Sequence, residues 1–350
     1  CVDPAFWRGK RVLLTGHTGF KGSWMSLWLA AMGSQVSGLA LAPDTDPNMF
    51  SVVRAGEGIE STICDLRDAK GVCAAVARVQ PEIVIHMAAQ PLVRRSVVAP
   101  SATFATNVTG TVNLLEALRK SERLRVILAV TTDKVYDNNG TRHIFVETDP
   151  LGGHDPYSAS KAAAEIVVQS FARTYFESAG VTVATARGGN VVGGGDFSDD
   201  RIVPDIWRAT KKGQPIKLRY PHAIRPWQHV LDCLSGYLCF VQALAERRVT
   251  APALNFGPDL NERITVADLT TSMQVALGAP TGWEYDSDAK PAEMEELQLD
   301  CRAARELLGW SSKLPIPRAL RATAEWYRAF ERNEDMRAVS IRAIEEYQRL

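Results

Sequence analysis

The stretch that decides the fold is RVLLTGHTGFKGSW, residues 11–24. Its apolar start runs directly into Gly16, Gly19 and Gly22, and an apolar segment typical of a helix follows over 20–32. Glycines at this spacing let the chain turn sharply. They also let a helix N-terminus approach a pyrophosphate, whose charge the N–H groups and the helix dipole stabilise. The order predicts a dinucleotide-binding unit, although a glycine-rich turn without a ligand would have the same pattern.

Short apolar, β-branched segments alternate with longer helical patterns through the first half of the chain. Strands that are apolar on both faces and are each followed by a helix indicate a parallel sheet covered on both sides. The predicted fold is therefore α/β, a doubly wound parallel sheet of the Rossmann type. The predicted strands are 11–15, 35–40, 61–64, 82–88, 125–132 and 181–187, and the predicted helices lie near 20–32, 68–79, 101–119 and 157–178.

After residue 188, glycine, aspartate and proline become frequent, which is typical of loops and short elements. A helix over 231–247 and a strand over 253–257 are predicted to return to the sheet, so the second domain is expected to be a smaller, interleaved α/β unit. The last helical stretch, 318–348, is rich in Arg and Glu and is expected to present a solvated face. The predicted boundaries are 8–190 for the dinucleotide-binding domain, with 228–258 returning to it, 191–227 and 259–317 for the substrate-binding domain, and 318–350 for a C-terminal helical segment.

Composition excludes several classes of protein. The 350 residues carry 40 Lys and Arg against 40 Asp and Glu, so a basic nucleic-acid-binding surface is not expected. The sequence has no long uncharged apolar run and no signal pattern before residue 11, which predicts no membrane partner and a cytoplasmic location. The six cysteines form no CxxC pair and the histidines no HxH or HExxH pair. We therefore expect buried thiols and no metal site.

The cofactor prediction is NAD. The second strand ends at Ala40 in a stretch without the acidic residue that often grips the adenosine ribose, and no arginine stands nearby for the 2′-phosphate of NADP. Asp65, which closes the third strand, is placed either to cap the adenine amino group or to N-cap the next helix. The expected cofactor contacts are Gly16, His17, Thr18, Gly19, Phe20, Gly22, Asp65, Leu66 and Ala88, together with Tyr157 and Lys161.

Two further motifs point to chemistry at the carboxyl ends of the strands. Tyr157 and Lys161 lie four residues apart at the start of a helix, so they share one face. A lysine beside a phenol favours the phenolate, which can take a proton from a hydroxyl while hydride leaves the same carbon. Thr132, Asp133 and Lys134 end the fifth strand, where a doubly wound sheet presents groups to its ligand. The alternatives are an ordinary amphipathic helix and a strand-end turn with solvated charges.

Seven segments carry a family resemblance over roughly residues 8–310. They are, in order, TGHTGFKG, HMAAQ, TNVTGTVNLLEA, TTDKVY, YSASK, RGGNVVGGGD and IRPWQHVLD. Together they resemble the extended short-chain dehydrogenase/reductase family and, within it, the nucleotide-sugar 4,6-dehydratases. The Thr-Asp-Lys triplet is similar to that of the subgroup acting on CDP-glucose. The dTDP-glucose enzymes have Thr-Asp-Glu there, and 4-epimerases have small or apolar residues after Ser or Thr.

The resemblance implies an internal redox reaction, NAD-dependent conversion of CDP-D-glucose to CDP-4-keto-6-deoxy-D-glucose. Tyr157, held by Lys161, would remove the proton of the 4-hydroxyl while hydride passes from C4 to NAD, and Thr132 would bond that oxygen. Lys134, or a water that it positions, would take the C5 proton while Asp133 protonates the departing C6 hydroxyl. Return of hydride to C6 makes the enzyme a lyase, placed by resemblance in deoxysugar and O-antigen synthesis.

The resemblance also implies substrate contacts. Arg225 stands where the family binds the diphosphate. Arg201 and Asn190 are further candidates, and Arg219 is a weaker one. Gln90 is placed either to reach the sugar hydroxyls or to bond its own loop.

The helices near 101–119 and 157–178 match those that pair in dimers of the superfamily, which implies a homodimer or a higher homo-oligomer. Two alternatives to the expected function stay open. One is a 4-epimerase or a dehydratase for another base. The other is a non-catalytic NAD-sensing protein on the same fold.

Overall fold

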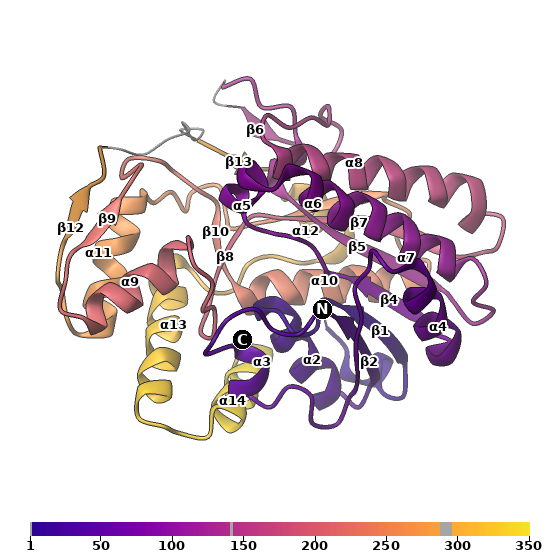
Figure 1. Cartoon of the computed structure of the whole chain (residues 1–350), viewed down its shortest axis with the longest axis horizontal. Helices are drawn as coiled ribbons and strands as arrows, with labels where there is room; N and C mark the ends of the chain where they lie inside the picture. The colour runs from indigo at the N-terminus through magenta and orange to yellow at the C-terminus, as the bar shows by residue number, and fades with distance from the viewer. Residues whose placement is uncertain (1, 141–142, 288–295) are drawn as a thin grey trace.

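A seven-stranded parallel sheet forms the centre of the computed structural model, which describes residues 2–140, 143–287 and 296–350. The strand order is β11-β7-β5-β4-β1-β2-β3, and every pairing in it is parallel. The predicted doubly wound α/β fold is confirmed (Figure 1). The strands are β1 (Arg11–Thr15), β2 (Gln35–Ala40), β3 (Glu60–Ile63), β4 (Ile83–His86), β5 (Val126–Thr132), β7 (Thr182–Gly188) and β11 (Ala253–Phe256).

Helices cover both faces of this sheet because its strands, apart from the exposed edge strand β3, are apolar on both faces. Along β1, Val12 and Leu14 pack into one core and Leu13 into the other, as the period-two alternation of a strand requires. The first core is covered by α2 (Phe20–Ala31) and α10 (Val230–Ala245), and the second by α4 (Ala69–Val79), α7 (Gly110–Leu118) and α8 (Pro156–Phe171).

The long helix predicted near 101–119 combines α6 (Pro100–Phe104), a π-helical turn η1 (Ala105–Thr109) and α7. A short helix α5 (Val93–Val98) precedes it, and α8 ends in a second π-helical turn, η3 (Ala172–Phe176). Both predicted helices therefore exist.

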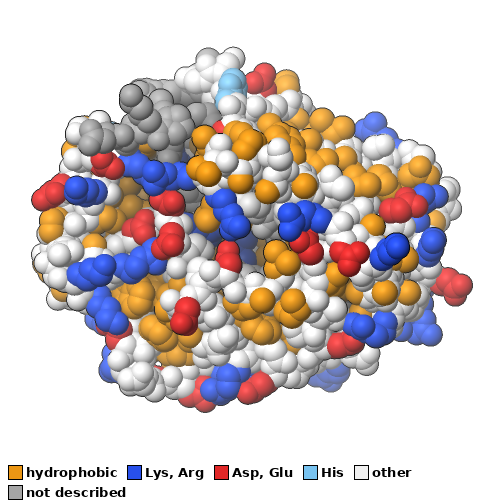
Figure 2. All heavy atoms as spheres, in the orientation of Figure 1, with side chains coloured by type: hydrophobic (Ala, Val, Ile, Leu, Met, Phe, Trp, Pro, Cys, Tyr) orange, Lys and Arg blue, Asp and Glu red, His pale blue; other side chains and the backbone are white. Residues whose placement is uncertain are grey.

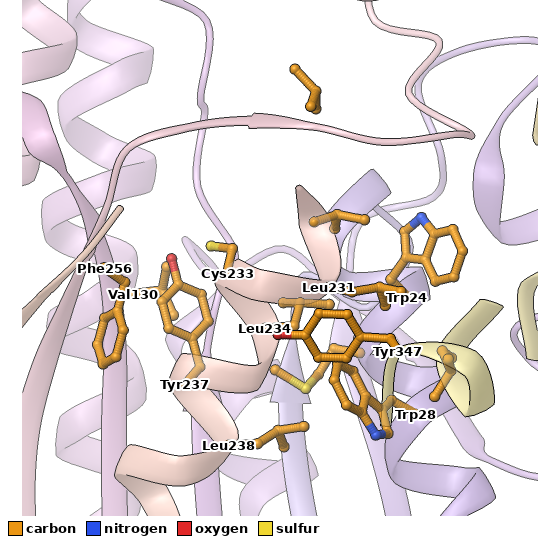
Figure 3. Close-up of a cluster of buried hydrophobic side chains, with 14 of the residues drawn as sticks. Trp24, Trp28, Val130, Leu231, Cys233, Leu234, Tyr237, Leu238, Phe256 and Tyr347 are labelled. Carbon is orange, nitrogen blue, oxygen red and sulfur yellow. The ribbon is translucent and has the colours of Figure 1, made fainter. Parts of the chain in front are cut away.

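Aromatic side chains fill the core between α2 and α10. Trp24 and Trp28 are both buried, and Figure 3 shows them with Leu231 and Leu234 of α10 and with Tyr347 from the end of the chain. The Trp24 indole donates to the carbonyl of Gly194 at 3.0 Å. This core joins α2, near the start of the chain, to α10 and to the C-terminal segment.

The second half of the chain adds short elements beyond the sheet. Three two-stranded ladders, β8–β10, β9–β12 and β6–β13, pair segments that are far apart in sequence. α10 and β11 return to the sheet, while α9, β9, α11 and β12 pack together on one side of Figure 1. The expected domain boundaries stay a prediction. The elements are β6 (Ile144–Phe145), β8 (Asn190–Val192), α9 (Ile202–Lys211), β9 (Ile216–Leu218), β10 (Trp227–His229), α11 (Val266–Leu277), β12 (Trp283–Tyr285), β13 (Gln298–Leu299) and α12 (Arg302–Leu308).

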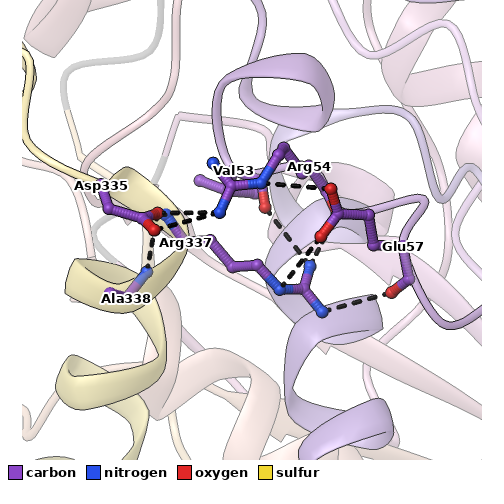
Figure 4. A network of polar contacts seen from close by, with 6 residues as sticks. All are labelled: Val53, Arg54, Glu57, Asp335, Arg337 and Ala338. Atoms are coloured by element: carbon purple, nitrogen blue, oxygen red, sulfur yellow. Dashed lines mark hydrogen bonds and ion pairs between the residues drawn. The ribbon is translucent and has the colours of Figure 1, made fainter.

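The C-terminal segment is helical and has the expected solvated face. It forms two helices, α13 (Ile316–Glu331) and α14 (Met336–Arg349), each of which buries one face and exposes the other. The Tyr347 hydroxyl donates to the buried Asp232 carboxylate at 2.7 Å. At the other end of α14, Asp335 and Arg337 bind the segment that follows α3 (Met49–Val52), through the Arg54 and Glu57 side chains and nearby carbonyl oxygens (Figure 4).

The glycine run 193–195 has a packing reason. A Cβ atom on Gly194 would lie 2.1 Å from Cγ of Trp326 in α13. A Cβ atom on Gly195 would lie 2.1 Å from the Met49 sulfur, and the φ of Gly195 is +86°. This loop can therefore fit between α2, α3 and α13 only without side chains.

Two findings concern membranes and cysteines. Among the described residues, no helix has both the length and the apolar character needed to cross a membrane. Cys64, Cys73, Cys233 and Cys301 are free thiols, as expected. Cys239 is disulfide-bonded, against the expectation that every cysteine is a free thiol. The sixth cysteine, Cys1, lies outside the described residues.

Candidate active site

The glycine turn between β1 and α2 is built for close backbone contacts. Gly16 has a φ of +77°, and its N–H donates to the Leu39 carbonyl at 2.9 Å. A Cβ atom on Gly16 would lie 2.8 Å from the backbone of Ala88, and one on Gly22 would lie 2.0 Å from the Gly16 carbonyl oxygen. Gly19 is the N-cap of α2 and offers no side chain to the first N–H groups of that helix. This exposed N-terminus fits the pyrophosphate of a dinucleotide.

The other predicted loop residues have partners of their own. The His17 ring is buried, and its Nε2 lies 2.7 Å from the Ser61 hydroxyl on β3. A Cβ atom on Gly38 would lie 2.3 Å from that ring, so His17 fills the space above β2. Burial lowers the pKa of His17 to about 4. Thr18 donates to the Leu41 carbonyl at 2.8 Å, and Phe20 packs near Gly193.

Of the two alternatives for Asp65 after β3, a role as N-cap of the next helix is wrong. Asp68, not Asp65, is the N-cap of α4, because its carboxylate accepts from the N–H groups of Lys70 and Gly71. The Asp65 carboxylate binds the Arg67 guanidinium and N–H, and the hydrogen bonds to Arg67 lower the pKa of Asp65. Leu66 is buried beneath α7 near Gly110.

Tyr157 and Lys161 lie at the start of α8, where Asp155 caps the helix and Pro156 occupies its first position. The buried Lys161 ammonium donates to the carbonyl of Val130 on β5 at 2.8 Å. Burial lowers the pKa of Lys161 to about 8. Burial also raises the pKa of Tyr157 to about 12, and a hydrogen bond with Thr132 opposes that shift.

The triplet at the end of β5 forms one connected group. The Thr132 hydroxyl donates to Oδ1 of Asp133 at 2.8 Å, and the Lys134 ammonium lies 3.4 Å from the same oxygen. Asp133 is almost fully buried, whereas about a fifth of the Lys134 side chain is exposed. The second carboxylate oxygen of Asp133, Oδ2, is buried without a hydrogen-bond partner. Since Thr132 also bonds Tyr157, the two predicted motifs meet at one point.

Of the predicted substrate residues, Arg201 lies close enough to this point for its charge to act on Tyr157. Asp196 holds the Arg201 guanidinium at 3.1 Å. Asn190, at the start of β8, has a buried side-chain oxygen without a hydrogen-bond partner, which leaves an acceptor for a ligand.

The other predicted substrate residues are placed differently. Gln90 makes the loop bonds that were its alternative, accepting from the Leu92 N–H at 2.7 Å and donating to the Thr103 hydroxyl at 3.0 Å. Arg225 is buried and donates to the carbonyl of Ile224 at 3.0 Å. Arg219 directly follows β9 and is half-buried. Among the described residues, no group of His, Cys, Asp and Glu could hold a metal.

Sequence reasoning missed the buried ion pair beneath the triplet. Glu165 and Arg187 are both buried, and the guanidinium binds both carboxylate oxygens. Thr131 donates to Glu165 at 2.6 Å, and Arg187 donates to the Tyr136 hydroxyl at 2.9 Å. The pair therefore ties α8 to β5 and β7. An arginine inside the apolar strand VTVATAR was the available signal, because a buried charge requires a partner.

Sequence reasoning also missed Lys21 and Tyr237. The Lys21 ammonium of α2 lies 3.5 Å from the Tyr237 hydroxyl of α10. The position of Lys21 was the signal, because a cation in the first turn of a helix opposes the helix dipole.

Comparisons with known proteins agree with this geometry. A family model described as GDP-mannose 4,6 dehydratase matches residues 13–323. The chain is 43% identical to CDP-glucose 4,6-dehydratase of Salmonella typhimurium, over 99% of this chain and 98% of that relative. Among solved structures, MoeE5 in complex with UDP-glucose and NAD has a TM-score of 0.78 at 25% identity, covering 92% of this chain and 100% of that one. The dTDP-glucose 4,6-dehydratase of Bacillus anthracis, in complex with NAD, has a TM-score of 0.78 at 20% identity, covering 94% and 98%.

The fold and the site together define an enzyme of the extended short-chain dehydrogenase/reductase type. The chain belongs to the GDP-mannose 4,6-dehydratase family, and as a nucleotide-sugar 4,6-dehydratase it is a hydro-lyase. The family membership predicted from the sequence motifs is confirmed.

The buried histidine of β4 generates a prediction about pH. Both ring nitrogens of His86 are hydrogen-bonded. Nδ1 lies 2.7 Å from the Thr15 hydroxyl, and Nε2 lies 3.0 Å from the Thr111 hydroxyl. Burial lowers its pKa to about 3. Below pH 6.5, His86 therefore binds a proton in the unfolded chain but not in the folded chain. Because of this, the free energy of unfolding decreases as the pH falls. We expect this one group to contribute a slope of about 1.4 kcal/mol per pH unit between pH 6 and 4.

Urea unfolding of the wild type and His86→Gln at a series of pH values measures this slope. The variant should lose less stability on acidification than the wild type. His154→Gln is the matched control, because that side chain is 61% exposed and should leave the slope unchanged. Equal slopes for His86→Gln and the wild type would contradict the assignment.

Proposed function

We propose that this protein binds NAD and converts CDP-D-glucose to CDP-4-keto-6-deoxy-D-glucose. The observation that carries the proposal is the meeting of two pairs, Tyr157 with Lys161 and Asp133 with Lys134, through the Thr132 hydroxyl. A 4-epimerase needs only the first pair, since it eliminates no water. Near-full-length identity of 43% to a CDP-glucose enzyme supports the choice of cytosine as the base.

The dinucleotide would lie on the glycine turn, with its pyrophosphate at the N-terminus of α2 and its adenosine near His17 and the end of β3. When bound, it supplies the hydride exchange, taking hydride from C4 of the hexose and returning it to C6. The chain's own residues carry every proton.

The first proton transfer belongs to Tyr157. Its phenolate takes the proton of the sugar 4-hydroxyl as the C4–H bond breaks and C4 becomes a ketone. Burial opposes ionisation of Tyr157, so the phenolate depends on groups that favour its charge. Lys161 does so as a cation on the same helix face, and the Thr132 hydroxyl would do so once its single proton turns from Asp133 to the phenolate oxygen.

Elimination needs Asp133 to hold a proton and Lys134 to be neutral. The direct contact of the two groups favours the opposite, ionised arrangement. The two arrangements, however, contain the same number of protons, so transfer of one proton from Nζ of Lys134 to the carboxylate of Asp133 interconverts them.

With that transfer made, the elimination balances. Lys134 takes the C5 proton, which the C4 ketone has acidified, and Asp133 gives its proton to the C6 hydroxyl, which leaves as water. The unpartnered Oδ2 of Asp133 is the oxygen available to the substrate. After hydride reaches C6, Lys134 returns a proton to C5. The proton gained by Tyr157 replaces, through solvent, the one lost by Asp133.

The diphosphate would bind arginines on the second half of the chain. Arg201 lies close enough to Tyr157 to act on its charge, and Arg225 is a buried guanidinium. The unpartnered side-chain oxygen of Asn190 is an acceptor for a hydroxyl or amino group of the ligand.

We also propose that the protein forms a homodimer through α5, α6 and α8. Apolar side chains are exposed along these helices, and Figure 2 shows hydrophobic side chains gathered over them. Val98 is 86% exposed and Ile166 60%. Apolar patches of this kind mark protein contacts.

Incubation with three nucleotide sugars tests the proposed substrate. We expect the 4-keto-6-deoxy product from CDP-glucose with a kcat/KM at least about tenfold above those for dTDP-glucose and UDP-glucose. With CDP-[4-²H]glucose, mass spectrometry should find the deuterium at C6 of the product. Product from dTDP-glucose alone would overturn the assignment of the base, and loss of the label to water would overturn the internal redox reaction.

Substitutions in the acid–base pair separate the steps. Asp133→Asn removes the acid, so we expect the 4-keto-6-deoxy product to form about 100-fold to 10,000-fold more slowly. The 4-keto hexose that still carries its C6 oxygen should accumulate and be trapped with borodeuteride. Lys134→Ala should abolish exchange of the C5 hydrogen with deuterated water. Wild-type turnover by the first variant, or wild-type exchange by the second, would refute the respective role.

The proposed dimer is tested by placing a charge in its face. Ile166→Arg should convert the dimer to a monomer in sedimentation velocity, because an unpaired guanidinium would be buried. Val275→Arg, at an equally exposed position on α11, is the control and should sediment like the wild type. A wild-type protein that sediments as a monomer would contradict the proposal.

A further inference from the structure

Lys21 occupies a position that is electrostatically unfavourable. It lies in the first turn of α2, where the helix dipole is positive and a cation is unfavourable. Its ammonium does not turn away into solvent. Instead it reaches α10, where it lies 3.5 Å from the Tyr237 hydroxyl and 5.4 Å from the centre of the Tyr237 ring. A charge that breaks a local rule in this way points to a role at a functional site.

Tyr237 gives Lys21 a fixed support. The Tyr237 side chain is fully buried in the core where α10 packs on β5, and it interacts with Cys233 of its own helix (Figure 3). Its hydroxyl lies where a Cβ atom on Gly188 would be only 2.4 Å away. Gly188 ends β7, so the hydroxyl is held against the carboxyl end of the sheet.

The Lys161 ammonium reaches the same part of the sheet from the other side. It donates to the carbonyl of Val130, which belongs to the same core as Tyr237. α8, which carries Lys161, packs on the opposite core from α2, which carries Lys21. Two ammonium groups thus converge on one edge of the sheet, one from each face.

We propose that Lys21, held on Tyr237, is a positioning residue that acts through Lys161 and adjusts the charge of the Tyr157–Lys161 pair. The inference rests on the proposed function, since it concerns the same site. It assigns no contact between Lys21 and the substrate.

The charges around Lys161 support this role. After burial, Lys21 is the group that most lowers the pKa of Lys161, to about 8, and Glu165 opposes it. A lysine with such a pKa can release and regain a proton near neutral pH, whereas one with an ordinary pKa stays charged. The titratable and charged groups around Lys161 and Lys21 are His86 on β4, Asp133 after β5, Tyr157 and Glu165 on α8, Cys233 and Tyr237 on α10, and Arg201 before α9.

Competitive acetylation of the full chain, without substrate, measures the ionisation of Lys161 directly. Trace acetic anhydride is added at pH values from 6 to 11, and mass spectrometry compares acetylation at Lys161 with that at the exposed Lys120. In Lys21→Met we expect the midpoint for Lys161 to rise by about 1 pH unit, because a neighbouring cation is lost. The same shift should appear in the pH profile of turnover with whichever nucleotide sugar the protein converts.

Two variants complete the design. Lys21→Arg keeps the charge and should keep the wild-type midpoint. Tyr237→Phe removes the hydroxyl that holds Lys21 and should give part of the shift, and it carries the test if Lys21→Met does not fold. A wild-type midpoint in a folded Lys21→Met, with the wild-type melting temperature, would overturn the inference. Because the labelling needs no substrate, failure of CDP-glucose to react would overturn the proposed function and leave this measurement readable.

Discussion

The hydrogen bond from the Lys161 ammonium to the Val130 carbonyl is the contact on which the arrangement of the site depends. It joins the first turns of α8 to the carboxyl end of β5 at 2.8 Å. Tyr157 lies one turn earlier on the same helix face, and the triplet follows Val130 by two residues. One contact therefore fixes the distance between the two groups of reactive side chains. Its burial makes it strong, since a buried ammonium without an acceptor would be very costly.

The structure beneath this contact is rigid for a second electrostatic reason. The Glu165 and Arg187 charges are buried together and satisfied by Thr131 and Tyr136. Breaking such a pair leaves an uncompensated buried charge, so the register of α8 against β5 and β7 is strongly specified. Above it, the Asp133–Lys134 contact is longer and partly exposed. The site thus combines a rigid, fully buried ion pair below with a longer, partly exposed contact above.

Six strands of the sheet were predictable because each is an apolar run with most of its side chains buried, and the glycine turn because backbone contacts exclude a Cβ atom. The edge strand β3 is largely exposed and lacks that pattern. The short ladders were not predictable, since β6 and β13 have two residues each and show no periodicity. Local charges were also hard to place. Nothing in the sequence distinguishes Asp65 from Asp68 as the helix cap, and the partner of Lys21 lies 216 residues away.

The short ladders have a consequence for the order in which the chain folds. Each is parallel, so none can close as a hairpin, and β6 meets β13 only after more than 150 intervening residues. Contacts between segments so distant slow folding, because the loop entropy is lost before the contact is made. During synthesis the cofactor half can assemble early. The segment carrying β6 cannot pair with β13 until most of the polypeptide has left the ribosome. Until then, its unpaired backbone is accessible to proteases and chaperones.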